Sequence, residues 1–435
     1  MFLKSKYKTP GKDYTIPQID LSQKPDKLPA ELDYLFENTV DDDSKAYLGH
    51  PDAVLLRDGR ILTFYPEGHG KGKTLSKISN DGGKSYSETI QNPPKSWENS
   101  RETPTVYRLE FSEHTWPDKL ILICGNPKWP GAPTTGGFNC SVSGDEGKTW
   151  SEYKLFYGKD DPDYTCVPVV SMSALVRLKE NGRFVDRWMG LFHERNFVNY
   201  QTILTFDDAG NMHWSKPRPY FADYRKLEKR SNMCEVACVR SDGGTGDELM
   251  LITRSNSKKI NSLLSFSQDE GKTWSEPKEA PAALNGERHK AVYLPDGRLF
   301  ITFRSIERDR EKLKKNYEKK SMKWYSEGWI AWVGTYDDLK NGREGQYRIK
   351  IAHTYLDDQN EPTVTANADT GYCGNVVLPD GTVVTASYGI FSTEKKASGT
   401  YKTDKGAQTR KTCIVSKRIN LADVEKLLPG KQNNA

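Results

Sequence analysis

The sequence predicts an all-β protein, a six-bladed β-propeller with four-stranded antiparallel blades and aspartate-containing outer turns. Three observations lead to this prediction. A short turn motif recurs along the chain, a strand–turn–strand pattern recurs beside it, and the composition, with 11% aromatic and 28% charged residues, is typical of a folded globular chain. Radial repetition of small sheets leaves few exposed edges, so consecutive β-sheet units are expected to surround one axis.

The repeated turn is clearest at Ser267–Ser275, Ser-Gln-Asp-Glu-Gly-Lys-Thr-Trp-Ser. Related copies are Ser143–Ser151 and Ser79–Ser87, and a degenerate copy spans Phe206–Ser215. We expect the aspartate to cap the turn, the glycine to adopt a positive φ, and the Trp or Tyr to pack beneath it. The turn is therefore structural, and each copy marks one β-sheet unit.

The second repeat consists of a strand, a tight turn and a returning strand. The copy at 289–303, His-Lys-Ala-Val-Tyr-Leu-Pro-Asp-Gly-Arg-Leu-Phe-Ile-Thr-Phe, places alternating apolar residues around Asp-Gly. The aspartate turns follow these hairpins, where the turn between a third and a fourth strand belongs. The six copies, one for each predicted blade, begin near residues 50, 102, 172, 235, 289 and 372.

The two ends of the chain are expected to complete the ring within a single domain, 1–435. The early strand 14–21 is predicted to complete the last blade, and 412–419 to be the late strand of that same blade. The N-terminal segment 1–45 is expected to hold the ring-closing strand. The C-terminal segment 420–435 is expected to form a short helix at 421–428 followed by a tail. Insertions at the rim of the propeller are expected at 305–328 and 355–371.

The composition excludes several function classes. A net charge of +5, from 64 basic and 59 acidic side chains, without a dense basic tract, predicts no nucleic-acid partner. No apolar run is long enough to span a membrane, and the first residues lack a signal-peptide core, so the chain as given is expected in the cytoplasm. The seven cysteines lack metal-ligand spacing and are expected to be buried free thiols, and neither a metal nor a cofactor is predicted.

The geometry of a propeller indicates where a site belongs. The first strand of each blade begins, and the second ends, at the same face of the central channel. Ionisable groups that converge there predict a site, because burial without a partner is costly. First-strand starts supply His50, Asp52, Glu102, Glu235, Arg288, His289 and Tyr372, and second-strand ends supply Glu67, His69, His193, Arg254 and Arg304.

The Ser-x-Asp-x-Gly-x-Thr-Trp turns resemble the Asp-boxes of the sialidase (neuraminidase) superfamily, over roughly residues 45–420. Sialidases carry a Glu and an Arg at these places in blade four and a nucleophilic Tyr in blade six, which Glu235, Arg254 and Tyr372 match. The resemblance implies an exo-glycoside hydrolase that acts on an anionic sugar, sialic acid or related, with retention. Tyr372 would attack the anomeric carbon and Glu235 would accept its proton.

The resemblance also implies an arginine cluster that binds the carboxylate of the substrate, with Arg254, Arg304 and Arg288 as candidates. We expect further substrate contacts from His289, His193, Glu102 and Glu67. The chain departs from sialidases in blade one, which begins Gly-His-Pro-Asp in place of Arg-Ile-Pro. That sequence, Gly-His-Gly-Lys-Gly and Trp-Val-Gly-Thr-Tyr resemble a sialidase-like branch of the superfamily.

The usual acid/base aspartate is missing from the loop Pro66-Glu-Gly-His-Gly-Lys-Gly72. His69, Glu67 or Asp52 is then the expected proton donor, and His50 is a further catalytic candidate.

Two other functions stay open at this point. A propeller polysaccharide lyase or His-dependent glycosidase, acting on glycans that contain uronic acid or rhamnose, would depend on His50, His69 or His289 and not on Tyr372. A non-catalytic glycan-binding propeller would not need a Tyr, a Glu and an Arg at one channel mouth. The expected partner is a glycan in each case.

Overall fold

The computed structural model describes most of the 435 residues. The described ranges are 4–6, 13–42, 47–68, 72–88, 90, 92–99, 102–127, 135–162, 164, 166–307, 326–352, 354, 370–391, 400–402, 408–410 and 412–428.

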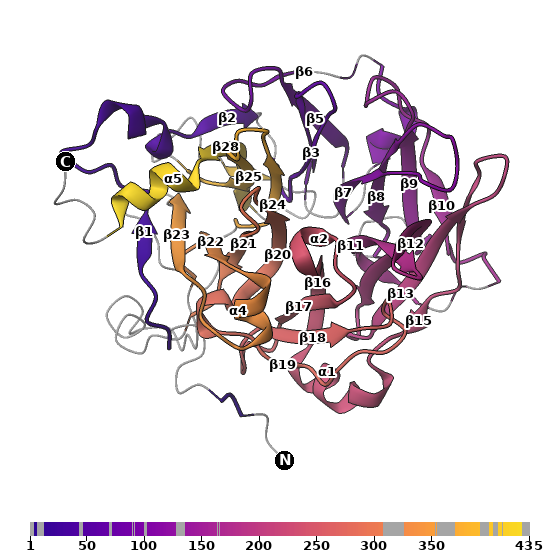
Figure 1. Ribbon diagram of the computed structural model, residues 1–435. Coiled ribbons are helices and arrows are strands. Elements are labelled where there is room, and N and C mark those ends of the chain that lie inside the picture. Colours follow the sequence, from indigo (N-terminus) through magenta and orange to yellow (C-terminus); the bar gives the residue numbers. More distant parts are fainter. Residues whose placement is uncertain are drawn as a thin grey trace.

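Within these ranges, six sheets of four or five strands surround a common centre, as Figure 1 shows. The first strand of each sheet contacts the first strands of the two neighbouring sheets around the whole ring. Successive strands of a sheet then pair antiparallel outward from the centre, except for one parallel strand at the outer edge of the fifth sheet. The predicted six-bladed propeller is confirmed, because each strand–turn–strand repeat supplies the two inner strands of one blade.

The first three blades follow the chain in order. Blade one is β3 (Asp52–Leu55), β4 (Ile61–Pro66), β5 (Thr74–Ser79) and β6 (Ser87–Glu88). Blade two is β7 (Glu102–Leu109), β8 (Lys119–Gly125), β9 (Phe138–Ser143) and β10 (Lys154–Phe156). Blade three is β11 (Pro168–Glu180), β12 (Arg183–Glu194), β13 (Asn199–Phe206), β14 (Met212–Trp214) and β15 (Arg218–Pro219).

The last three blades complete the ring. Blade four is β16 (Met233–Arg240), β17 (Leu249–Ser255), β18 (Leu263–Ser267) and β19 (Lys278–Glu279). Blade five is β20 (Gly286–Tyr293), β21 (Leu299–Ser305), β22 (Trp329–Gly334) and β23 (Tyr347–Ala352), with β1 (Gln18–Asp20) at its outer edge. Blade six is β24 (Cys373–Val377), β25 (Val383–Gly389), β28 (Cys413–Ile419) and β2 (Thr39–Asp42), and β26 (Thr400–Lys402) pairs with β27 (Gln408–Arg410) apart from it.

Ring closure differs from the prediction for strand 14–21. Part of that stretch, β1, pairs in parallel with β23 of blade five and does not reach blade six. The later strand β2 pairs antiparallel with β28 and completes blade six. Both strands lie in the N-terminal segment, but the sequence pattern at 14–21 identified a strand without identifying its partner.

Helices occur only as short connections within the described residues. A helix was predicted at 421–428, and its first two turns are present as α5 and η5. The rim insertions predicted at 305–328 and 355–371 lie mostly outside the described residues. The helical segments are η1 (Ala30–Phe36), η2 (Lys95–Asn99), η3 (Ala222–Tyr224), α1 (Arg225–Ser231), α2 (Ser241–Gly244), η4 (Ala282–Leu284), α4 (Tyr336–Lys340), α5 (Leu421–Val424) and η5 (Glu425–Leu427).

The aspartate turns have the predicted geometry. Asp269 accepts hydrogen bonds from the backbone N–H and the hydroxyl of Thr273 and from the hydroxyl of Ser267. Gly271 has φ +76, and a Cβ at this position would lie 2.5 Å from the sulfur of Met189 in blade three. The turn thus needs glycine both for its backbone conformation and for the close approach of the neighbouring blade.

Apolar side chains fill the space between adjacent blades, and few large ones are exposed. Trp274 is 6% exposed, and it packs with apolar side chains of blades three and four. The seven cysteines are free thiols; six are buried and one is partly buried, as predicted. No helix of the described residues is long and apolar enough to cross a membrane.

Candidate active site

Irregularities in the first strands set the direction of the site residues. Glu235 in β16 has φ +49, and the pairing of β16 with β17 shifts between Cys234 and Ala237. Such a β-bulge leaves an extra residue in one strand and re-aims the neighbouring side chains. Comparable shifts occur near the starts of β7, β11 and β20. Four of the six inner strands therefore have the same kind of irregularity near their starts, where candidate site residues lie.

Tyr372, Glu235 and Arg254 meet in one hydrogen-bonded group. The phenol of Tyr372 donates to Glu235 Oε1 at 2.7 Å and accepts from Arg254 Nη1 at 2.8 Å. Arg254 Nη1 also donates to both oxygens of Glu235 at 2.7 Å. Tyr372 lies just before β24, Glu235 in β16 and Arg254 near the end of β17, so blades four and six supply the group.

A second glutamate, Glu287 of β20, binds three cations behind this group. Its Oε1 accepts from Arg254 Nη2 at 2.7 Å and from Lys258 Nζ at 3.0 Å. Its Oε2 accepts from Arg304 Nε at 2.7 Å and from Arg304 Nη2 at 2.5 Å. Glu287 is 2% exposed, and the three cations offset the cost of burying its charge.

The protonation states follow from this arrangement. Burial alone would raise the pKa of Glu235, but the attraction to Arg254 outweighs it and the net pKa is lowered. Burial, followed by the negative charge of Glu235, raises the pKa of Tyr372 well above its ordinary value. The site at neutral pH therefore contains a neutral phenol that donates to an ionised carboxylate.

Six of the predicted residues line one cavity of about 430 Å³. They are Tyr372, Glu235, Arg254, Arg304, His193 and Glu102. The cation of Arg304 lies 5.2 Å from the ring centre of Tyr372. Burial lowers the pKa of His193 to about 4, so its ring is neutral at physiological pH. The structure thus brings together half of the residues predicted for the site.

The structure places four other candidates away from this lining. Asp52 binds Lys290 Nζ through both carboxylate oxygens, at 2.8 and 3.0 Å. His289 Nε2 lies 2.9 Å from the carbonyl oxygen of Leu284, and Arg288 donates to the carbonyl oxygen of Ser173 at 3.2 Å. These contacts indicate structural roles for Asp52, His289 and Arg288. Glu67 forms a β-bridge with Leu48 and also lies outside the lining.

The two remaining candidates differ. His50 is 2% exposed, and its ring centre lies 4.8 Å from that of Tyr372 and 5.0 Å from that of Tyr388. Its ring packs against the ring of Tyr372, the candidate nucleophile, but His50 does not line the cavity. His69 lies outside the described residues.

Several site residues were missed by the sequence reasoning. Glu287 immediately precedes Arg288, which was chosen in its place. The bulge at the start of β20 interrupts the alternation of side chains between the two faces of the strand, so the sequence pattern does not show which of the two residues faces the site. Asn256 accepts from Arg254 Nη2 at 2.7 Å, and Lys258 binds Glu287. Arg195 adds an exposed cation to the lining. Asn256 and Lys258 follow β17 directly, so their nearness to Arg254 in sequence could have indicated them.

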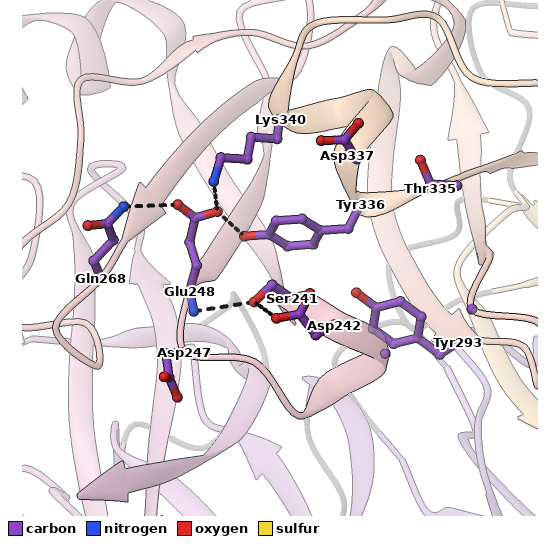
Figure 2. A pocket seen from close by; sticks show the side chains of 12 residues that line it. Ser241, Asp242, Asp247, Glu248, Gln268, Tyr293, Thr335, Tyr336, Asp337 and Lys340 are labelled. Atoms are coloured by element: carbon purple, nitrogen blue, oxygen red, sulfur yellow. Dashed lines mark hydrogen bonds and ion pairs between the residues drawn. The ribbon is translucent and has the colours of Figure 1, made fainter. Parts of the chain in front are cut away.

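A larger cavity, of about 670 Å³, lies at blades four and five (Figure 2). Its central carboxylate, Glu248, is paired with Lys340 at 3.0 Å and accepts from the hydroxyl of Tyr336 at 3.1 Å. None of the predicted site residues lines it. We therefore assign the candidate active site to the smaller cavity, where a phenol, a carboxylate and a guanidinium converge. Among the described residues, no group of three or more His, Cys, Asp or Glu side chains could hold a metal ion.

Comparison with known proteins agrees with this fold and the predicted resemblance. The family described as the BNR repeat-like domain matches residues 111–383, more than half of the chain, and the chain belongs to this family. The predicted resemblance to the sialidase superfamily is confirmed. A sialidase of Clostridium perfringens is 26% identical over 290 residues, which cover 62% of this chain and 69% of the relative.

Two solved structures share the propeller fold. The α-L-arabinofuranosidase of Fusarium graminearum in complex with arabinobiose has a TM-score of 0.55 at 12% identity, and the match covers 89% of this chain and 98% of that one. A mutant of the NanB sialidase from Streptococcus pneumoniae has a TM-score of 0.51 at 11% identity, with coverage of 88% and 70%.

Proposed function

We propose that this protein is an exo-acting glycoside hydrolase that retains the anomeric configuration, with Tyr372 as nucleophile and Glu235 as the base that activates it. The observation that carries the proposal is the 2.7 Å hydrogen bond from the phenol of Tyr372 to Glu235 inside a cavity large enough for a sugar ring. A phenol is a weak nucleophile at neutral pH, so an adjacent ionised carboxylate is the partner that it needs.

The first step forms a bond between Tyr372 Oη and the anomeric carbon and breaks the glycosidic bond. The phenol proton passes to Glu235, and Arg254, 2.8 Å from the phenol oxygen, stabilises the negative charge that develops there. The leaving oxygen takes a proton from a general acid, for which His69 stays the predicted donor. Water then attacks the same carbon from the side that the leaving group vacated and gives a proton to the deprotonated general acid. The bond between Tyr372 Oη and the carbon breaks, and the phenol regains its proton from Glu235, so the configuration is retained.

An anionic sugar is the proposed substrate class. Three arginines and two glutamates line the cavity, and Lys258 beside them offsets the buried Glu287, so the formal charge around the cavity is positive and attracts an anion. A neutral phenol also approaches a negatively charged sugar without the repulsion that a carboxylate nucleophile would meet. One relative is described as a sialidase, and the Fusarium graminearum enzyme is described in complex with arabinobiose, which supports the proposal of a glycan partner here.

The test is turnover of a panel of fluorogenic glycosides by the parent protein, Tyr372→Phe and Tyr336→Phe. The control is closely matched, because the Tyr336 hydroxyl also donates to a glutamate but lies outside the cavity. We expect Tyr372→Phe to lose about a thousandfold or more in kcat/KM and Tyr336→Phe to retain it. Turnover by Tyr372→Phe close to that of the parent would exclude the tyrosine mechanism.

The same proteins distinguish the alternative functions. A lyase would release an unsaturated uronate that absorbs in the ultraviolet, and Tyr372→Phe would keep most of that activity. A glycan-binding propeller would bind an oligosaccharide in calorimetry without converting it.

A further inference from the structure

The hydrogen-bond donors of Arg254 are already used within the protein. Its Nη1 hydrogens point to Glu235 and to the Tyr372 oxygen, and its Nη2 hydrogens point to Asn256 and Glu287, all at 2.7–2.8 Å. Its Nε is buried and has no partner among the described residues, so it does not face the cavity. Arg254 therefore has no pair of parallel N–H groups to offer to a substrate carboxylate.

Glu287 takes the place of such a carboxylate. Two of the three guanidinium groups that line the cavity, those of Arg254 and Arg304, bind it with N–O distances of 2.5–2.7 Å. Burial alone would raise the pKa of Glu287, but the three neighbouring cations, with Arg254 first, lower it far below its ordinary range. The carboxylate is thus a permanent internal counter-ion of the arginine pair.

We infer that the sugar cleaved in this cavity has no carboxylate on its anomeric carbon, so that it is an aldose or a uronic acid and not a sialic acid. This inference rests on the proposed function, because it concerns the substrate of the Tyr372 site. Within the proposed anionic class it leaves sugars whose negative charge lies away from the anomeric carbon, such as uronic acids, and it also admits neutral aldoses.

The position of the nucleophile requires this restriction. Attack begins with the anomeric carbon about 3–3.5 Å from Tyr372 Oη. A carboxylate bonded to that carbon would lie beside Glu235 and Arg254. It would meet the like charge of Glu235 without a free arginine fork, and an unpaired carboxylate in a buried site is costly. A hydrogen on the anomeric carbon avoids this cost. A uronate carboxylate lies several bonds from the anomeric carbon, so attack by Tyr372 does not place it beside Glu235, in a cavity that Arg195 also lines.

A binding experiment tests the inference separately from catalysis. The probe is the unsaturated analogue of N-acetylneuraminic acid, whose carboxylate is attached to the carbon in the anomeric position. Calorimetry would compare the parent protein with Glu287→Gln, which removes the internal charge, and with Glu270→Gln. The control residue pairs with Arg240 through both oxygens, at 2.7 and 2.6 Å, and lies outside the cavity.

We expect no binding of the probe to the parent or to Glu270→Gln. We expect Glu287→Gln to bind it at least about tenfold more tightly than the parent, because an arginine donor pair becomes available. Micromolar binding of the probe to the parent overturns the inference. The parent measurement decides this even if Glu287→Gln does not fold.

Turnover separates this inference from the proposed function. Hydrolysis of an aldoside or uronide that is lost in Tyr372→Phe, with a sialoside left intact, supports both. Hydrolysis of a sialoside that is lost in Tyr372→Phe supports the tyrosine mechanism and overturns the inference. Hydrolysis that persists in Tyr372→Phe contradicts the proposed function. The binding measurement with the probe still shows whether the cavity of the parent accepts a carboxylate on the anomeric carbon.

Discussion

Arg254 determines the ionisation of the residues around it. It is shared by Glu235, Glu287, Asn256 and the phenol of Tyr372, so one guanidinium keeps two carboxylates ionised and holds the phenol oxygen in place. Burial opposes ionisation of Glu235, and Arg254 is the largest opposing influence on its pKa. The side chain therefore acts on the protonation of the base as well as on its position.

This dependence predicts a shift in the pH profile. If Glu235 must be ionised to accept the proton, the acid limb of kcat/KM follows its pKa. Arg254→Met removes the cation and leaves the effect of burial, so the limb should move to higher pH while kcat falls. Arg254→Lys should give an intermediate profile. The measurement is kcat/KM against pH, with Arg108→Met as control, since Arg108 pairs with Glu146 outside the cavity. An unchanged acid limb in Arg254→Met would contradict this account.

Single residues were predictable where strand geometry places them directly. Tyr372, Glu235 and Arg254 were selected from strand starts and ends together with the resemblance, and they lie within hydrogen-bonding distance of one another. Glu287 was not selected, because the bulge in β20 is not visible in the sequence pattern. Asp52 and His289 were selected because they are ionisable and well placed. Their structural partners, Lys290 and the carbonyl of Leu284, could not be identified without the fold.

At the scale of elements, the aspartate turn is a local structure that the sequence predicts well. In the degenerate copy two adjacent aspartates remain, and the structure shows that Asp207 accepts from the backbone and the amide side chain of Asn211. This is the contact that Asp269 makes with Thr273, four residues further along in both turns. The pairing of strands was harder to predict. The alternation of apolar and polar residues at 14–21 identified the strand β1, but it gave no information on which blade β1 joins.

The turn contacts predict a loss of stability in Asp269→Ala. The substitution removes a carboxylate that accepts three hydrogen bonds, so the free energy of unfolding should fall by roughly 1–3 kcal/mol. The exposed Asp208 of the degenerate copy provides the control, Asp208→Ala, which should have little effect. Denaturant unfolding measures both.

The difference in the free energy of unfolding between the parent and Asp269→Ala should also depend on pH. The pKa of Asp269 is lowered, because the hydrogen bonds from Thr273 and Ser267 outweigh the effect of burial. The contribution of the Asp269 carboxylate to the free energy of unfolding is therefore fully present above the ordinary aspartate pKa. It is lost as the pH falls through the pKa of Asp269 in the folded protein. A difference between the parent and Asp269→Ala that persists undiminished in acid would argue against hydrogen bonding as the cause.

At the scale of the whole molecule, one buried lysine joins segments that are distant in sequence. Lys417 of β28 donates to the carbonyl of Leu21, beside β1, and to the carbonyl of Ile351 in β23, each at 2.8 Å. It is 1% exposed and connects blade six, blade five and the N-terminal segment. A neutral amine has two N–H donors, and these two carbonyls satisfy both, whereas the protonated form would bring a third donor and a charge into the interior.

Lys417 should therefore make the stability of the ring depend on pH above neutrality. Burial lowers the pKa of Lys417 in the folded protein to about 7, against about 10.5 in the unfolded chain. Between these values the unfolded chain binds more protons, so stability should rise as the pH increases from about 7 toward 10. In Lys417→Met this rise should be reduced, whatever the effect of the substitution on stability at pH 7, and in Lys272→Met, at an exposed turn position, it should persist. Thermal unfolding midpoints measured across this range provide the test. Equal slopes for the parent and Lys417→Met would mean that the lysine is charged in the folded ring.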